Sequence, residues 1–156
     1  MDADHRFVAS LEWTGNRGGG TTGYRAYGRD HVVRVEGKPA IDGSAARVFH
    51  GDVDRWNPEE LLIAALAQCH LLSYLYVAVA NGIVVESYTD DAEGFLVTTP
   101  DGGGRFREVV LRPVVTISAG DPELALSIHA EASEKCFIAA SVNFPVHHEP
   151  VIALAQ

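Results

Sequence analysis

Two cysteines, Cys69 and Cys136, are the residues of this 156-residue chain with the clearest potential for chemistry. Cys69 lies in the middle of the longest apolar segment, from Leu61 to Ala80, and Cys136 opens a second apolar stretch that runs to Val142. Free cysteine is among the most buried residue types, and a buried thiol is inert unless a neighbouring group favours its thiolate. The two cysteines are therefore either core residues or a working redox pair.

A reactive thiol in an apolar site needs a nearby cation to ionise near neutral pH. The glycine-rich turn from Thr14 to Gly20 carries Arg17, whose guanidinium could reach such a pocket. A buried arginine would itself need a carboxylate, and Glu59 could supply it. Arg17, Glu59 and Cys69 are thus a candidate reactive set.

The element that must position Cys69 is a long helix. Asn57 is a good N-cap, Pro58 suits the first helical position, and two glutamates follow in the first turn. The pattern predicts a helix to about Ala80 that stops at Asn81-Gly82. Both of its faces are apolar, so both must be covered.

Along this helix Glu59 and Cys69 lie about 15 Å apart and cannot touch. Small residues, Ala64 and Ala65, lie at their midpoint, with Ala67 following. An identical helix crossing antiparallel at this point would make a two-fold dimer, with Glu59 of one chain beside Cys69 of the other. Alternatively, the alanines lie under the chain's own sheet.

The remaining pattern predicts an α+β fold within a single domain, 1–156, with strands first, then the helix, then strands with helix. A shorter helix is expected from the Asp121 cap to about Glu134, and a third short helix over Cys136–Val142. The expected strands are Phe7–Trp13, Tyr24–Tyr27, His31–Glu36, Ile83–Asp90, Gly94–Thr99, Phe106–Ser118 and Phe144–Leu154, with a turn over Gly37–Gly43.

Charge and composition limit the possible partners and location. The net charge is −9 and no basic stripe is present, which argues against nucleic acid as a partner. The N-terminus, Met1–Arg6, is polar and acidic, unlike a signal peptide. Polar residues from Gln68 to Ser73 interrupt the apolar segment, so we expect a core helix and no membrane span. A cytoplasmic location is expected, where the cysteines would be reduced unless they cycle through catalysis.

The segment Asn57–Cys69, with its Asn-Pro-Glu start, closely resembles the hallmark helix of the osmotically inducible protein C and organic hydroperoxide resistance (OsmC/Ohr) family. Cys136–Ser141 looks like the second-cysteine segment of that family, and Trp13–Gly19 is similar to its first hairpin. Together these segments make the chain resemble the OsmC-like branch over nearly its whole length.

The resemblance implies an OsmC/Ohr-like fold: an intertwined homodimer with two long central helices packed against antiparallel β-sheets. It also implies a thiol-dependent peroxidase for oxidative-stress defence, with no metal and no cofactor. In that scheme the Cys69 thiolate attacks an organic hydroperoxide and becomes a sulfenic acid. Cys136 then forms a disulfide with Cys69, and an external dithiol, such as a lipoyl group, reduces it. Glu59 matches the carboxylate that holds the catalytic arginine.

The sequence departs from the family pattern at three points. His70 follows the first cysteine where an aromatic residue is more usual, and Phe137 stands where many members have proline. The catalytic arginine is also open: Arg17 matches the Ohr-like position, whereas the OsmC-like branch places its arginine later, which suits Arg47. The remaining candidates are Arg25 and Arg29.

Three rival interpretations remain. A metal site at His147-His148 or Cys69-His70 lacks ligand spacing, and we expect His147 and His148 on the surface of an edge strand. A Cys69 hydrolase with His70 or His129 as base lacks a motif for an oxyanion hole. A non-catalytic small-molecule-binding or stress protein of the same fold is the third alternative.

Overall fold

The structure is a computed structural model that describes residues 4–156, so the first three residues of the polar N-terminus, Met1–Ala3, lie outside it. The chain divides into two compact units, residues up to 61 and residues 62–156. Each unit is described by itself. The expectation of one domain over 1–156 stays a prediction.

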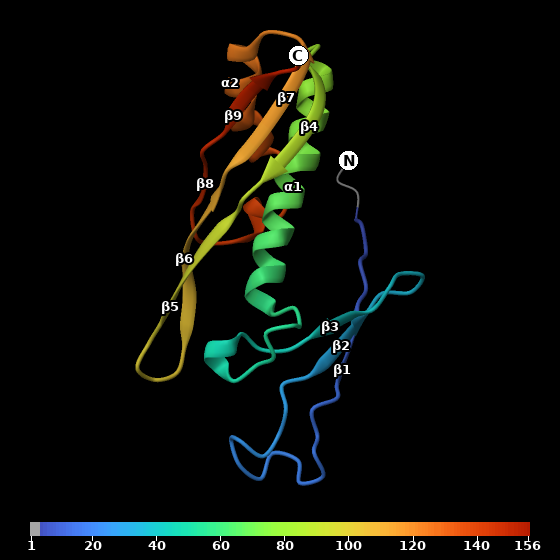
Figure 1. Ribbon diagram of the computed structural model, residues 1–156, viewed down its shortest axis with the longest axis vertical. Coiled ribbons are helices and arrows are strands. Elements are labelled where there is room, and N and C mark those ends of the chain that lie inside the picture. Colours follow the sequence, from blue (N-terminus) through green and yellow to red (C-terminus); the bar gives the residue numbers. More distant parts are fainter. Residues whose placement is uncertain (1–3) are drawn as a thin grey trace. The chain divides into compact units, whose positions relative to one another are not determined.

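The first unit contains a three-stranded antiparallel sheet in the order β1-β2-β3 (Figure 1). In its register Leu11 pairs with Val33, and Val33 pairs with Ile41. The first strand is shorter than the expected Phe7–Trp13. The elements of this unit are β1 (Ser10–Trp13), β2 (His31–Arg34), β3 (Ile41–Gly43) and the short 3-10 helix η1 (Arg47–Phe49).

Two expectations for this unit are wrong. The segment Tyr24–Tyr27 forms turns and no strand, because the Arg29 guanidinium binds the carbonyl oxygens of Tyr24 (2.7 Å) and Tyr27 (2.8 Å). Those carbonyls are then unavailable to a neighbouring strand. The end of the expected turn over Gly37–Gly43 is instead β3, since it pairs with β2.

The long helix α1 (Pro58–Ala80) has the predicted bounds. Its N-terminus is capped as expected, because the Asn57 side-chain oxygen accepts the Glu60 backbone N–H at 2.8 Å. At its C-terminus Gly82 has a φ of 67°, and the Ile83 N–H donates to the Ala78 carbonyl at 3.0 Å. A left-handed glycine of this kind is the common way to end a helix.

The two faces of α1 differ sharply in burial. Its buried residues follow one helical face: Leu66, His70, Tyr74, Val77 and Ala78. The opposite face leaves large apolar side chains exposed: Leu72, Leu75, Tyr76 and Val79. By length and composition α1 is the one helix within residues 4–156 that could cross a membrane, although core helices of soluble proteins pass the same test.

The second unit builds two further three-stranded sheets, ordered β4-β7-β9 and β5-β6-β8. The last strand of each sheet, β9 and β8, pairs in parallel, so the sheets are mixed rather than wholly antiparallel as expected. The elements are β4 (Val84–Asp90), β5 (Glu93–Thr98), β6 (Gly104–Leu111), β7 (Pro113–Ala119), α2 (Pro122–Glu134), η2 (Ala139–Ser141), β8 (Val146–His148) and β9 (Val151–Leu154).

Three predicted elements are broken in the structure. The expected strand over Phe106–Ser118 divides at Arg112, whose N–H donates to an Asp90 carboxylate oxygen at 2.7 Å, and Pro113 has no N–H to continue the ladder. The expected strand Phe144–Leu154 divides into β8 and β9 ahead of Val151, where Pro150 interrupts it. The expected third helix is a turn followed by η2.

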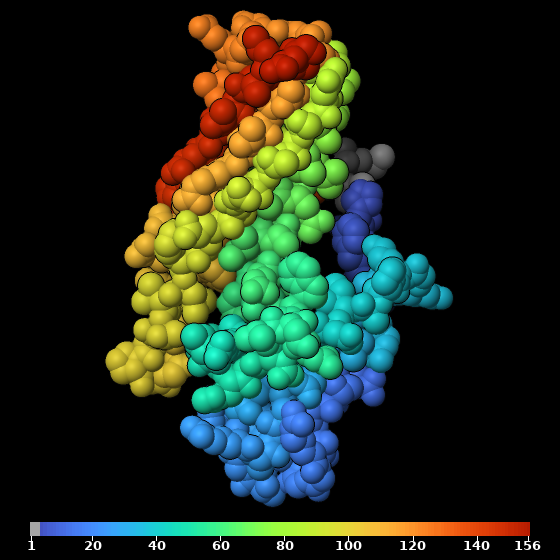
Figure 2. Space-filling view, in the orientation of Figure 1, coloured from blue at the N-terminus to red at the C-terminus, as the bar shows by residue number. Residues whose placement is uncertain are grey.

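Both helices of the second unit pack on one face of the sheet β4-β7-β9. Residues from all these elements share one buried cluster: Tyr74, Val77 and Ala78 of α1, Ala125, Ile128 and Ala132 of α2, and Ile83, Val115 and Ile117 of the sheet side. The opposite face of this sheet lies uncovered in Figure 2, where its strands run side by side from yellow-green to red. The core therefore lies between the sheet and the helix that carries Cys69.

Candidate functional site: a pair of thiols

Cys69 lies at the middle of α1, where the buried and exposed faces of the helix meet. Its side chain is half-buried and its thiol is free. It opens on a groove of about 450 Å³. The other residues that line the groove are Leu72, Ser73, Tyr76, Lys135 and Phe137. Most of this lining is apolar, and Lys135 is the single charged residue in it, paired with Glu131 at 3.6 Å.

Cys136 follows the end of α2 and is buried, with 2% of its surface exposed. Its sulfur accepts the backbone N–H of Ala139 at 3.4 Å. Burial raises the pKa of the Cys136 thiol to about 11, and the next largest cause is a hydrogen bond with the side chain of Cys69. The two free thiols are therefore neighbours, although they come from distant parts of the sequence.

This geometry gives the two thiols different chemistry. Cys69 is the one that reaches a groove, so a reagent arriving from solvent meets it first. Cys136 stays protonated near neutral pH and neighbours Cys69, as a resolving thiol must. The structure thus brings together the two cysteines that the sequence singled out.

Glu59 lies in the first turn of α1, and its Oε2 atom is buried without a hydrogen-bond partner among the described residues. The ion pairs formed within residues 4–156 do not include Glu59. Arg17, the expected partner, lies on an exposed turn and pairs with Asp30 at 3.4 Å. The side chain as a whole is half-buried, and a hydrogen-bond donor or cation beside Oε2 would satisfy this oxygen.

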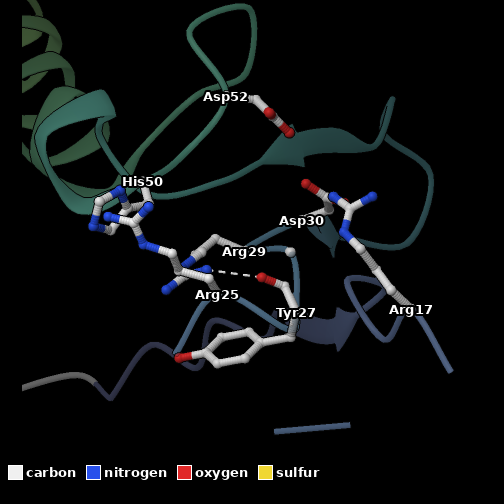
Figure 3. Close-up of a pocket in the computed structure, with 8 residues that line it drawn as sticks. Arg17, Arg25, Tyr27, Arg29, Asp30, His50 and Asp52 are labelled. Carbon is white, nitrogen blue, oxygen red and sulfur yellow. Dashed lines mark hydrogen bonds and ion pairs between the residues drawn. The ribbon is translucent and has the colours of Figure 1, made fainter. Parts of the chain in front are cut away.

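Arg17 lines a polar pocket of about 300 Å³ in the first unit (Figure 3). Asp30 and Asp52 lie on the same side of the pocket as Arg17, and the pKa of Asp52 is raised, chiefly by a hydrogen bond with Asp30. The other side holds Arg25, Arg29 and His50. Within the described residues Arg17 pairs with Asp30, whereas Asp52 pairs with Arg55.

The four candidate arginines have different surroundings in the structure. Arg29 is structural, because besides its two carbonyl bonds it stacks over the rings of Tyr24 (4.7 Å) and Tyr27 (4.3 Å). Arg47 opens η1, and Arg25 lines the same pocket as Arg17. The catalytic assignment of Arg17 stays a prediction, as do the roles of Glu59 and the two cysteines.

One expectation about the histidines is wrong. His147 is exposed and lies 3.5 Å from Glu108, but His148 turns inward and its ring lies 4.3 Å from that of His70. Since successive strand residues face opposite sides of a sheet, adjacent histidines in a strand cannot both face solvent when one face is buried. The alternation of side chains along a strand could therefore have predicted from the sequence that one of these two histidines is buried. Within the described chain, no three His, Cys, Asp or Glu side chains are grouped so as to hold a metal ion.

Comparisons with known proteins agree with this fold. The sequence model of the OsmC-like protein family matches residues 50–150. An uncharacterised Bacillus subtilis protein, YmaD, is 25% identical over 146 residues, covering 90% of this chain and 89% of YmaD. The chain belongs to the OsmC-like family.

Solved structures give the same result. An OsmC-like protein of unknown function from Vibrio cholerae is 32% identical, with a TM-score of 0.84 over 95% of this chain and 100% of that one. A Legionella pneumophila protein described as an organic hydroperoxide resistance protein OsmC has the same fold at 21% identity, with a TM-score of 0.69 over 97% and 99% of the two chains. The α+β, OsmC/Ohr-like fold predicted from the sequence is confirmed.

Proposed function

We propose that this protein is a thiol-dependent peroxidase that reduces organic hydroperoxides to alcohols in oxidative-stress defence. The observation that carries the proposal is the proximity of a groove-facing thiol, Cys69, to a buried thiol, Cys136. Core cysteines have no need of a partner, whereas a peroxidase with a resolving cysteine needs one within bonding reach.

The proposed reaction has two balanced steps. In the first, the Cys69 thiolate attacks the terminal peroxide oxygen, the O–O bond breaks, and the alkoxide takes up a proton to leave as an alcohol. Cys69 is then a sulfenic acid. In the second, the Cys136 sulfur attacks the Cys69 sulfur, and the hydroxyl group leaves as water with the Cys136 proton. An external dithiol, for example of the lipoyl type, reduces the resulting disulfide.

The groove at Cys69 favours organic substrates over hydrogen peroxide. Leu72, Tyr76 and Phe137 offer apolar surface to an alkyl group next to the thiol. Each buried methylene group contributes about 0.8 kcal/mol, a gain that hydrogen peroxide cannot obtain. We therefore expect the preference to grow with the size of the alkyl group.

We further propose that the active form is an intertwined homodimer. Exposed apolar residues form a stripe on α1 at helical spacing, from Leu72 through Tyr76 to Val79, and a second copy of the chain would cover them. The contact would also enclose the groove at Cys69. In the dimer Glu59 would hold Arg17 beside the Cys69 of the partner subunit, and Arg17 would favour the thiolate.

The proposal includes a cytoplasmic location, where an external dithiol is available, and a mechanism that uses neither metal nor bound cofactor. It is tested with reduced, metal-free protein, a lipoyl-type dithiol and matched amounts of cumene hydroperoxide or hydrogen peroxide. We expect catalytic consumption of the organic peroxide and much slower consumption of hydrogen peroxide. A protein that binds the organic hydroperoxide without consuming it would instead be the non-catalytic binding protein of the same fold.

A further inference from the structure

Three histidines from three different elements form a buried cluster in the second unit. His70 of α1 and His129 of α2 are joined by a bond of 3.0 Å between Nε2 and Nδ1, and only 0% and 3% of their surfaces are exposed. The ring of His148 of β8 packs against that of His70 at a tilt of 35°, with 4.3 Å between ring centroids. The proposed peroxidase chemistry uses none of these rings.

The cluster connects the two segments that carry the thiols. His70 directly follows Cys69 on α1. His129 lies on α2, which ends at Glu134, shortly before Cys136. The His70–His129 bond therefore ties one thiol-bearing segment to the other, and His148 adds the last strand of the neighbouring sheet.

The bond requires that at least one of the two rings is neutral. One imidazole nitrogen must donate and the other must accept, so the pair shares one proton, and two protonated rings would present two donors to each other. The outer nitrogens, Nδ1 of His70 and Nε2 of His129, are buried without a hydrogen-bond partner among the described residues. A charge placed on either ring would be unpaired.

The groups around the cluster reinforce neutrality. Burial and the neighbouring histidines lower the pKa of His70 to about 3 and that of His129 to about 4. Tyr74 stacks on His129 at 4.1 Å, and its hydroxyl donates to the Ala125 carbonyl, so it offers the rings no anion. Two further ionisable groups lie beside members of this cluster: Tyr88 of β4, which faces Tyr74, and His147 of β8, which lowers the pKa of His148.

We propose that His70 and His129, held by His148, are positioning residues that keep Cys69 and Cys136 at disulfide-forming distance, and that protonation of the cluster releases them. The use of this spacing in catalysis rests on the proposed peroxidase function, but the spacing itself does not. The cluster would couple the disulfide equilibrium to acidification through contacts that leave the thiols themselves untouched.

The test measures the equilibrium of the Cys69–Cys136 disulfide with reduced and oxidised glutathione near neutral pH, without any peroxide. Replacing both partners, His70→Phe with His129→Leu, removes the bond without leaving an orphaned nitrogen. We expect the effective concentration of the two thiols to fall about tenfold or more in this double variant, since small misplacements are costly in such reactions. The matched control His147→Gln alters an exposed neighbour and should leave the value unchanged.

A second measurement needs no variant. Imidazole proton resonances of the wild-type protein, followed from about pH 8 to about pH 5.5, should show that His70 and His129 stay neutral throughout. Ordinary titration of His70 and His129 in the folded protein would overturn the proposal, as would an unchanged disulfide equilibrium in the double variant. If the disulfide equilibrium behaves as predicted but the protein does not consume peroxides, only the proposed function is contradicted.

Discussion

The buried thiol of Cys136 neighbours the half-buried thiol of Cys69, close enough to raise the pKa of Cys136. This proximity links the middle of α1, which carries Cys69, to the segment just after the end of α2, which carries Cys136. The two residues differ in their access to solvent. Cys69 lines the groove that substrate would enter, and Cys136 is buried next to it.

Substitution of each cysteine should therefore give a different defect. Cys69→Ser should abolish peroxide reduction, because a hydroxyl cannot form the sulfenic acid. Cys136→Ser should still consume about one equivalent of peroxide and leave a persistent sulfenic acid on Cys69. Mass spectrometry after a dimedone trap measures this species. Equal loss of the first turnover in both variants would contradict the assigned roles.

Arg17 is predicted to act on Cys69, and its neighbour in the pocket offers a matched control. Arg17→Ala should lower kcat/KM for the organic hydroperoxide by about 100-fold, the scale of losing one positioned charge. Arg25→Ala removes the same charge from the same pocket and should leave activity within about twofold of wild type. If Arg25→Ala lowers kcat/KM more than Arg17→Ala does, the catalytic arginine is Arg25.

The exposed apolar stripe of α1 should be an interface between two copies. Leu72→Glu places a charge in that stripe, and we expect it to convert a dimer to a monomer in sedimentation or light scattering. Leu126→Glu is the control, because Leu126 is also an exposed helical leucine, on α2. If the wild-type protein is monomeric at assay concentration, the proposal that two subunits share one active site is wrong.

Stability should depend on pH through the histidine cluster. The folded-state pKa values of His70 and His129, about 3 and about 4, lie below the ordinary value of 6.5. Between these values the unfolded chain binds more protons, so the stabilisation is complete above about pH 6.5 and is lost as the pH falls. The free energy of unfolding should drop by about 1.4 kcal/mol per pH unit for each histidine.

Urea unfolding at a series of pH values measures this slope. His147→Gln should retain the wild-type acid limb, whereas the His70→Phe, His129→Leu double variant should flatten it. A wild-type stability that does not change between about pH 6.5 and about pH 5 would show that the two rings are not held neutral by the fold.

The sequence predicted the elements that are set by local interactions better than those set by contacts between distant residues. Local capping chemistry set the bounds of α1 and α2, because Asn57 and Asp121 each bond a backbone N–H in the first turn. The strand breaks were harder to predict. Arg112 ends a strand because of a distant carboxylate, Asp90, and no local pattern shows that bond.

The site divides in the same way. The spacing and apolar setting of Cys69 and Cys136 were visible in the sequence, but their proximity depends on how α2 packs against α1. The sequence predicts Glu59 as the carboxylate partner of Arg17. In the structure Arg17 pairs with Asp30, through a contact across a turn that no local pattern shows. The sequence predicts both His147 and His148 on the surface of an edge strand, whereas strand alternation turns His148 inward.

The central claim is that an organic hydroperoxide drives a disulfide between Cys69 and Cys136. The direct measurement treats the fully reduced protein with about one equivalent of cumene hydroperoxide, blocks the remaining thiols and maps the peptides by mass spectrometry. The account predicts loss of both free thiols, a Cys69–Cys136 cross-link and release of one equivalent of the alcohol. Two intact thiols beside unconsumed peroxide would contradict it.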